Sequence, residues 1–108
     1  PRPPIDIENA WYKFYAYIIP SNLKEGWTRD RILYEISTSG FPALSGSCSE
    51  IYLEKCFLDK SFLPVKRLPI ARLLGETSLM FLVHPTITED QMNIYGEAIR
   101  KVLLKAYR

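Results

Sequence analysis

SLMFLV, residues 78–83, is an uninterrupted apolar run in the second half of this 108-residue chain. The run is too short for an independent helix, and its length is typical of a strand. A strand without polar alternation is usually covered on both of its faces. We therefore predict a strand over residues 78–83 that is covered on both faces.

The segment after this strand predicts the last helix of the chain. Thr88 and Gln91 stand in the spacing of a capping box, in which each side chain bonds the other residue's backbone N–H. Ile94 and Leu104 fall outside the apolar stripe of the helix. The stripe itself recurs at helical spacing and comprises Met92, Tyr95, Ile99, Val102, Leu103 and Ala106.

Upstream of the central run, the pattern predicts two strands with a helix between them. Residues 11–19, WYKFYAYII, alternate as a strand with two largely apolar faces. A helix over residues 28–39 has Thr28 as its cap and Gly40 in the left-handed position after its end. Residues 41–44 form a second, short strand that Pro42 limits.

Two short helices are expected between residues 45 and 75. Ser47 and Glu50 have capping-box spacing, which predicts a helix that begins there and buries Ile51 and Phe57. Residues 68–75 carry Pro early and Gly late, as short helices do.

The order of elements predicts an α+β fold, with a small antiparallel or mixed sheet of about three strands backed by helices. Helices can cover one face of this sheet. The other face is also apolar, which indicates a missing neighbour. Alternatively, the loops 20–26 and 58–66 fold over it.

The first residues read Pro1-Arg2-Pro3-Pro4 and include no initiator Met. Such a segment is typical of an extended connector. We divide the chain into a connector, residues 1–10, and one domain, residues 11–108. A connector at the start suggests that a larger upstream part has been cut away.

Composition narrows the class of protein. The net charge of +2 is too small for the clustered basic surface of a nucleic-acid binder. The sequence contains no stretch of transmembrane length, no signal peptide and no metal-ligand spacing. Cys48 and Cys56 are expected to be free thiols, which fits a cytoplasmic protein.

The loop Ser45-Gly46-Ser47-Cys48-Ser49-Glu50 is the first candidate binding element. Its small residues allow a backbone to approach a ligand, and Ser47 and Ser49 offer hydroxyl groups. If the loop opens a helix, free N–H groups there favour a phosphate or carboxylate. A plain capped turn explains the same residues equally well.

His84 is the second candidate, because it is the only histidine and follows the central strand. It could donate a hydrogen bond to a sugar hydroxyl or a phosphate, although a structural hydrogen bond is the simpler interpretation. For Tyr12, Tyr15 and Tyr17 we expect core packing rather than stacking on nucleic-acid bases.

Three motifs in this order are similar to the C-terminal region of DegT/DnrJ-type (StrS-like) sugar aminotransferases. They are Gly40-Phe41-Pro42, Leu68-Pro69-Ile70-Ala71 and His84-Pro85-Thr86-Ile87-Thr88. The resemblance covers residues 11–106. Residues 45–52 depart from it, because many members carry a His- and Pro-containing, Tyr-rich segment at that place.

The resemblance implies a pyridoxal-phosphate enzyme of fold type I that moves an amino group, commonly from glutamate, onto a nucleotide-linked keto-sugar. It also implies that the Schiff-base lysine lies in a large domain upstream, since Lys55 and Lys60 have the wrong context. The chain would then be the small domain of a homodimeric enzyme, inactive alone. It would bind substrate through Ser45, Gly46, Ser47, Ser49 and His84, and would bind no cofactor itself.

Two other classes of function stay open at this stage. One is a regulatory relative of the same family that has lost the reactive lysine. The other is a free-standing α+β module that binds a small ligand or RNA. The presence or absence of a reactive lysine in the upstream sequence separates the regulatory relative from an enzyme. A salt-dependent affinity for nucleic acid would identify an RNA-binding module.

Overall fold

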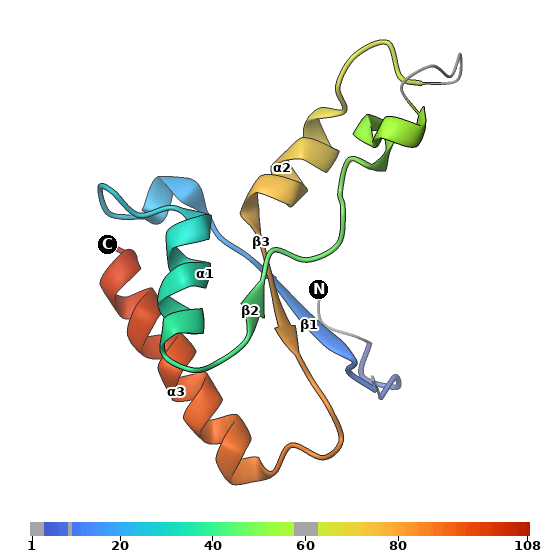
Figure 1. Cartoon of the computed structure of the whole chain (residues 1–108). Coiled ribbons are helices and arrows are strands. Elements are labelled where there is room, and N and C mark those ends of the chain that lie inside the picture. The colour runs from blue at the N-terminus through green and yellow to red at the C-terminus, as the bar shows by residue number, and fades with distance from the viewer. Residues whose placement is uncertain (1–3, 9, 58–62) are drawn as a thin grey trace.

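The computed structural model describes residues 4–8, 10–57 and 63–108, and Figure 1 shows their arrangement. Within these ranges three strands form one antiparallel sheet in the order β1-β3-β2. The strands are β1 (Lys13–Tyr17), β2 (Ala43–Leu44) and β3 (Ser78–Leu82). The predicted α+β class is confirmed, and the predicted apolar strand is β3, which lies between the other two.

The register of the sheet decides which residues share a face. Phe14 lies opposite Phe81, and Ala16 lies opposite Leu79. Directly opposed residues point to the same side, so these four face one way. Tyr15, Tyr17, Leu44 and Met80 face the other way. β1 is shorter than the predicted strand 11–19, because regular pairing with β3 ends at Lys13.

Two helices cover the first face of the sheet (Figure 1). They are α1 (Arg29–Thr38) and α3 (Glu89–Ala106). Ile32 and Ile36 of α1 are completely buried there. The core is completed from the sheet and from α3 by Leu79, Phe81, Tyr95, Val102 and Ala106.

The predicted helix ends are largely confirmed. The Thr28 side chain accepts a hydrogen bond from the Arg31 N–H, and Gly40 has φ +93° after the end of α1. Thr88 and Gln91 form the complete capping box at the start of α3. Ile94 and Leu104 are exposed, as their place outside the stripe predicts.

The loop after β1 packs on the helix side of the sheet. It contains a short 3-10 turn, η1 (Pro20–Asn22), and Leu23 in the core. Leu23 pairs with Tyr107 after α3, and the Tyr107 hydroxyl accepts a hydrogen bond from the Ile19 N–H. The idea that residues 20–26 cover the second face of the sheet is therefore wrong. Residues 58–62 of the other proposed cover lie outside the described residues.

Residues 48–57 and 63–77 form an arm that extends away from the sheet (Figure 1). It contains two 3-10 turns, η2 (Ile51–Leu53) and η3 (Lys55–Phe57), and the helix α2 (Pro69–Thr77). The radius of gyration is 16.6 Å, whereas a compact domain of this length has about 13 Å. The arm therefore adds length without joining the core.

Candidate functional site

The loop of residues 45–49, which we name the serine loop, crosses the sheet beside the start of β3. The Ser78 hydroxyl donates a 2.5 Å hydrogen bond to the Ser45 carbonyl. Gly46 has φ +95°, and a Cβ atom there would lie 2.7 Å from Tyr15 Cε1. Glycine is thus needed twice, for its backbone conformation and for the close approach to the tyrosine ring.

Tyr15 fixes the middle of the serine loop from β1. Its hydroxyl oxygen lies 3.0 Å from Ser47 Oγ and accepts a 3.3 Å hydrogen bond from the Ser47 N–H. The hydrogen bond with the Ser47 side chain lowers the pKa of Tyr15 below its usual value. Two hydroxyl groups therefore lie side by side on the face of the sheet that the helices leave open.

Ser49 connects the serine loop to the arm. A Cβ atom on Gly75 of α2 would fall 2.0 Å from Ser49 Oγ, so a larger residue there would force the Ser49 side chain to move. Gly75 also accepts, through its carbonyl, a 2.9 Å hydrogen bond from Arg29 Nη1. The Ser49 hydroxyl has no hydrogen-bond partner within the ranges that the structure describes and can bond a ligand.

The predicted capping box at Ser47 and Glu50 is wrong. Ser47 pairs with Tyr15, and residues after Glu50 form the three-residue turn η2 without a side-chain cap. A single 3-10 turn lacks the aligned N–H groups and the dipole of an α-helix. The predicted anion site at a helix N-terminus is therefore wrong. The groups with which the loop can bind a ligand are its hydroxyls.

Glu50 instead closes the base of the arm. It receives hydrogen bonds of 2.7 and 2.5 Å from Arg67 and one of 2.6 Å from the Tyr52 hydroxyl. The hydrogen bonds from Arg67 and Tyr52 lower the pKa of Glu50 to about 2. Tyr52 in turn accepts from the Leu68 N–H just before α2. The group thus ties the 3-10 turns to the start of that helix.

His84 lies at the opposite end of β3 from the serine loop. It follows Ser78 by six residues, which is about 20 Å of extended chain. Its Nδ1 lies 2.7 Å from Thr86 Oγ1 and 3.3 Å from the Thr86 backbone nitrogen. The structure brings Ser45, Gly46, Ser47 and Ser49 together but leaves His84 apart, in a local turn.

The sequence analysis did not identify Tyr15 as a partner of the serine loop. Core packing of the three tyrosines is wrong for Tyr12 and Tyr17, which are 73% and 47% exposed. Strand alternation does place Tyr15 and Tyr17 on one face. The presence of two tyrosines on one face of this strand was the signal from which a contact with the loop could have been predicted.

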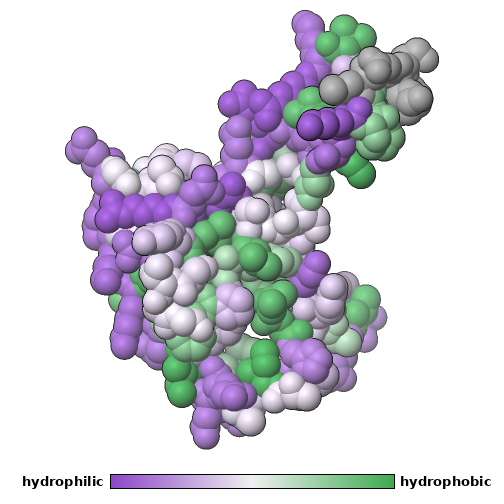
Figure 2. Space-filling model, viewed as in Figure 1, coloured by the Kyte–Doolittle hydropathy of each residue, from purple (hydrophilic) through white to green (hydrophobic). Residues whose placement is uncertain are grey.

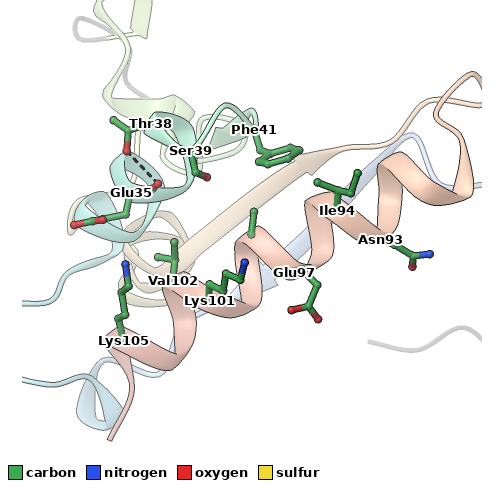
Figure 3. A pocket seen from close by; sticks show the side chains of 11 residues that line it. Glu35, Thr38, Ser39, Phe41, Asn93, Ile94, Glu97, Lys101, Val102 and Lys105 are labelled. Atoms are coloured by element: carbon green, nitrogen blue, oxygen red, sulfur yellow. Dashed lines mark hydrogen bonds between the residues drawn. The ribbon is translucent and has the colours of Figure 1, made fainter.

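A cleft of about 710 Å³ between α1 and α3 was not predicted from the sequence. In Figure 3, the Lys105 side chain points from α3 toward Glu35 of α1, and Lys101 also lines the cleft. Glu97 also lines the cleft. Both signs of charge are present in similar number, so the cleft has no net preference for an anion or a cation.

The described lysines were tested as anchors for pyridoxal phosphate. A Schiff-base lysine needs a lowered pKa, which burial commonly supplies. None of the lysines within the described ranges is buried, Lys55 included. Lys60 lies outside those ranges. The described lysines therefore lack the burial that a Schiff-base anchor for pyridoxal phosphate needs.

Other cofactor and membrane classes were also tested on the described residues. Cys48 and Cys56 are free thiols, as expected, and both are exposed. Within the described ranges no group of three or more acidic, His or Cys side chains could hold a metal ion. No helix in these ranges has the length and apolar character needed to cross a membrane.

The fold and the sequence together place the chain among regions of known aminotransferases. An aminotransferase from Psychrobacter cryohalolentis matches 90% of the chain at 52% identity, with a TM-score of 0.85. A DegT DnrJ EryC1 StrS aminotransferase from Brucella abortus shares the fold over 94% of the chain, at 21% identity and a TM-score of 0.67. The resemblance to that group is confirmed.

The matched region is only part of these relatives. The chain spans 25% of the length of each solved aminotransferase. No protein-family model and no curated protein sequence matches the chain.

Proposed function

We propose that this chain is the C-terminal small domain of a pyridoxal-phosphate-dependent nucleotide-sugar aminotransferase, with residues 1–10 as connector and 11–108 as the domain. The observation that carries the proposal is the 52% identity over 90% of the chain to a solved aminotransferase. The whole enzyme, a cytoplasmic homodimer, transfers an amino group from glutamate to a keto-sugar. Its product serves cell-surface polysaccharide or secondary-metabolite synthesis.

The serine loop supplies the substrate contacts in this proposal. Sugars and phosphates present many hydroxyl and phosphoryl oxygens, which hydroxyl side chains bind as donors and acceptors. The hydroxyls of Ser47 and Ser49 and the backbone at Gly46 are the groups offered. Gly46 lets the loop pack closely on the Tyr15 ring, which holds the Ser47 hydroxyl on the open face of the sheet. His84 serves as a more distant contact for a hydroxyl or phosphate.

The large domain of the parent enzyme holds the cofactor in this proposal. Pyridoxal phosphate supplies an electron sink for carbanion chemistry when bound. Within the described residues no lysine is buried, so we expect the Schiff-base lysine in the large domain. The work of the present chain is to bind and orient the nucleotide-sugar and to help exclude water from it.

An absorbance spectrum of the full-length parent protein with pyridoxal phosphate tests the proposal. We expect a visible cofactor band that bleaches when glutamate is added. If no band forms at saturating cofactor, the enzyme reading fails and the regulatory relative replaces it. A band that glutamate leaves unchanged would exclude glutamate as the amino donor but would still show that the protein binds the cofactor.

A further inference from the structure

The helix α2 carries an apolar stripe that nothing in the described chain covers. Ile70, Leu73 and Leu74 recur at the spacing of one helical face. Their exposed fractions are 65%, 52% and 42%. Arg72 and Glu76, an ion pair of 2.7 Å four residues apart, give the helix a separate polar side. The helix is therefore amphipathic, and its apolar side faces solvent.

The position of the arm makes this exposure unusual. The residues before α2 form a small apolar cluster around Tyr52, Phe57 and Leu63, which does not cover the stripe. Figure 2 shows hydrophobic side chains at the surface of the arm as well as on the body. Single exposed apolar residues need no explanation, whereas a contiguous stripe on a projecting helix marks a contact surface.

We propose that the α2 stripe docks on the large domain of the same parent polypeptide, and this inference rests on the proposed function. The matched region is 25% of each solved aminotransferase, so most of each chain lies outside it and forms a tethered neighbour. Tethering raises the effective concentration to about the millimolar range. A small apolar contact is then sufficient.

A second copy of the chain is a poorer occupant on grounds of area. A stable interface between separate proteins buries roughly 800 Å² on each partner. The three side chains of the stripe supply only a fraction of that area, so a second copy would also have to cover other exposed apolar residues of the arm, Leu53, Val65 and Leu68. The tethered large domain needs no such additional area.

Docking at α2 would also position the serine loop. Ser49 packs against Gly75, one residue beyond the stripe, and Gly75 is tied to α1 through Arg29. A partner that fixes α2 therefore fixes the loop relative to the sheet. The stripe is the element through which the large domain sets the position of the substrate-binding hydroxyls.

Amide hydrogen exchange of the full-length parent protein tests this inference with a matched pair of variants. Ile70→Glu introduces a charge into the stripe, near the N-terminus of α2, where a carboxylate favours the helix itself. Ile94→Glu makes the same change on α3, at a site of similar exposure, 60% against 65%. Any loss specific to Ile70→Glu therefore reports docking rather than helix stability.

We expect amides of α2 to be protected in the wild-type parent. Ile70→Glu should lower that protection by about tenfold, the order expected for one buried aliphatic side chain, and Ile94→Glu should not. Unprotected α2 amides in the wild type, or equal losses in both variants, overturn the inference. Protection that depends on protein concentration also overturns it in favour of a second copy. The cofactor spectrum is a separate measurement. The docking proposal can therefore be disproved without disproving the proposed enzyme function, and the reverse also holds.

Discussion

The Tyr15 hydroxyl and Ser47 Oγ lie 3.0 Å apart although 32 residues separate them in the sequence. One belongs to an edge strand, and the other belongs to a loop without regular structure. Their contact sets the height of the serine loop above the open face of the sheet. Several properties of the candidate site depend on this pair.

Tyr15→Phe in the full-length parent should weaken substrate binding without affecting the reaction with glutamate. The change removes one hydroxyl and leaves Ser47 without its partner, which corresponds to about a threefold to tenfold rise in KM for the nucleotide-sugar. Steady-state kinetics with both substrates check this. Tyr34→Phe, on a side chain that is 69% exposed, is the matched control. Equal effects of the two variants on KM would show that Tyr15 does not contribute to substrate binding.

Gly46→Ala should destabilise the chain more than Gly40→Ala. Both glycines have a positive φ, +95° and +93°, so both substitutions cost about 1 to 2 kcal/mol in backbone conformation. Only at Gly46 does the new Cβ meet Tyr15, at 2.7 Å, whereas nothing lies within 4 Å at Gly40. Urea denaturation of the two variants measures the difference. Similar midpoints would mean that the tyrosine moves aside freely.

Tyr95→Phe should lower the free energy of unfolding by about 1 kcal/mol. The Tyr95 hydroxyl donates to the Pro42 carbonyl and thereby ties α3 to the approach of β2. The ring stacks on Phe41 and meets Phe81 edge to face, and phenylalanine keeps both contacts. Thermal unfolding beside Tyr34→Phe provides the comparison. A loss near zero would show that water replaces the hydroxyl contact.

Acid should loosen the arm through Glu50. Hydrogen bonds from Arg67 and Tyr52 lower the pKa of this carboxyl from 4.5 to about 2 in the folded chain. A depressed folded-state pKa contributes stability above pH 4.5, and that contribution is lost as the pH falls toward 2. The protection factors of the α2 amides, which compare observed exchange with the intrinsic rate at each pH, should fall in that window.

Glu50→Gln should remove most of this pH dependence, because the neutral amide does not titrate. Glu97→Gln, which breaks an exposed pair with Arg100 on α3, should leave it unchanged. An acid response that persists in Glu50→Gln would assign it to another carboxylate.

The elements that the sequence predicted best are those with local causes. The capping box at Thr88 and Gln91, the cap at Thr28 and the glycine after α1 each depend on residues within one turn of one another. The apolar run 78–83 is similarly unambiguous, because almost every residue of β3 is buried. Local signals were sufficient for the sheet and for the two helices on it.

The arm and the site were predicted less well because their partners are distant in sequence. Ser47 and Glu50 have capping-box spacing, yet each side chain bonds a residue much farther away, Tyr15 and Arg67. Tertiary contacts therefore override the local pattern at these positions. The serine loop was identified as a candidate from its small residues, but its geometry depends on a sheet face that no local signal defines.

β1 lies at the edge of the sheet in the described chain, and this position has a consequence for handling the protein. Residues 11–19 are strong strand formers that contain no proline and in which Lys13 is the only charge. An unpaired edge of this composition is a template for strand addition by another chain. Purified alone, the chain should therefore form β-rich aggregates as its concentration rises, which a thioflavin assay would detect. Replacement of exposed Tyr17 by Lys should suppress them.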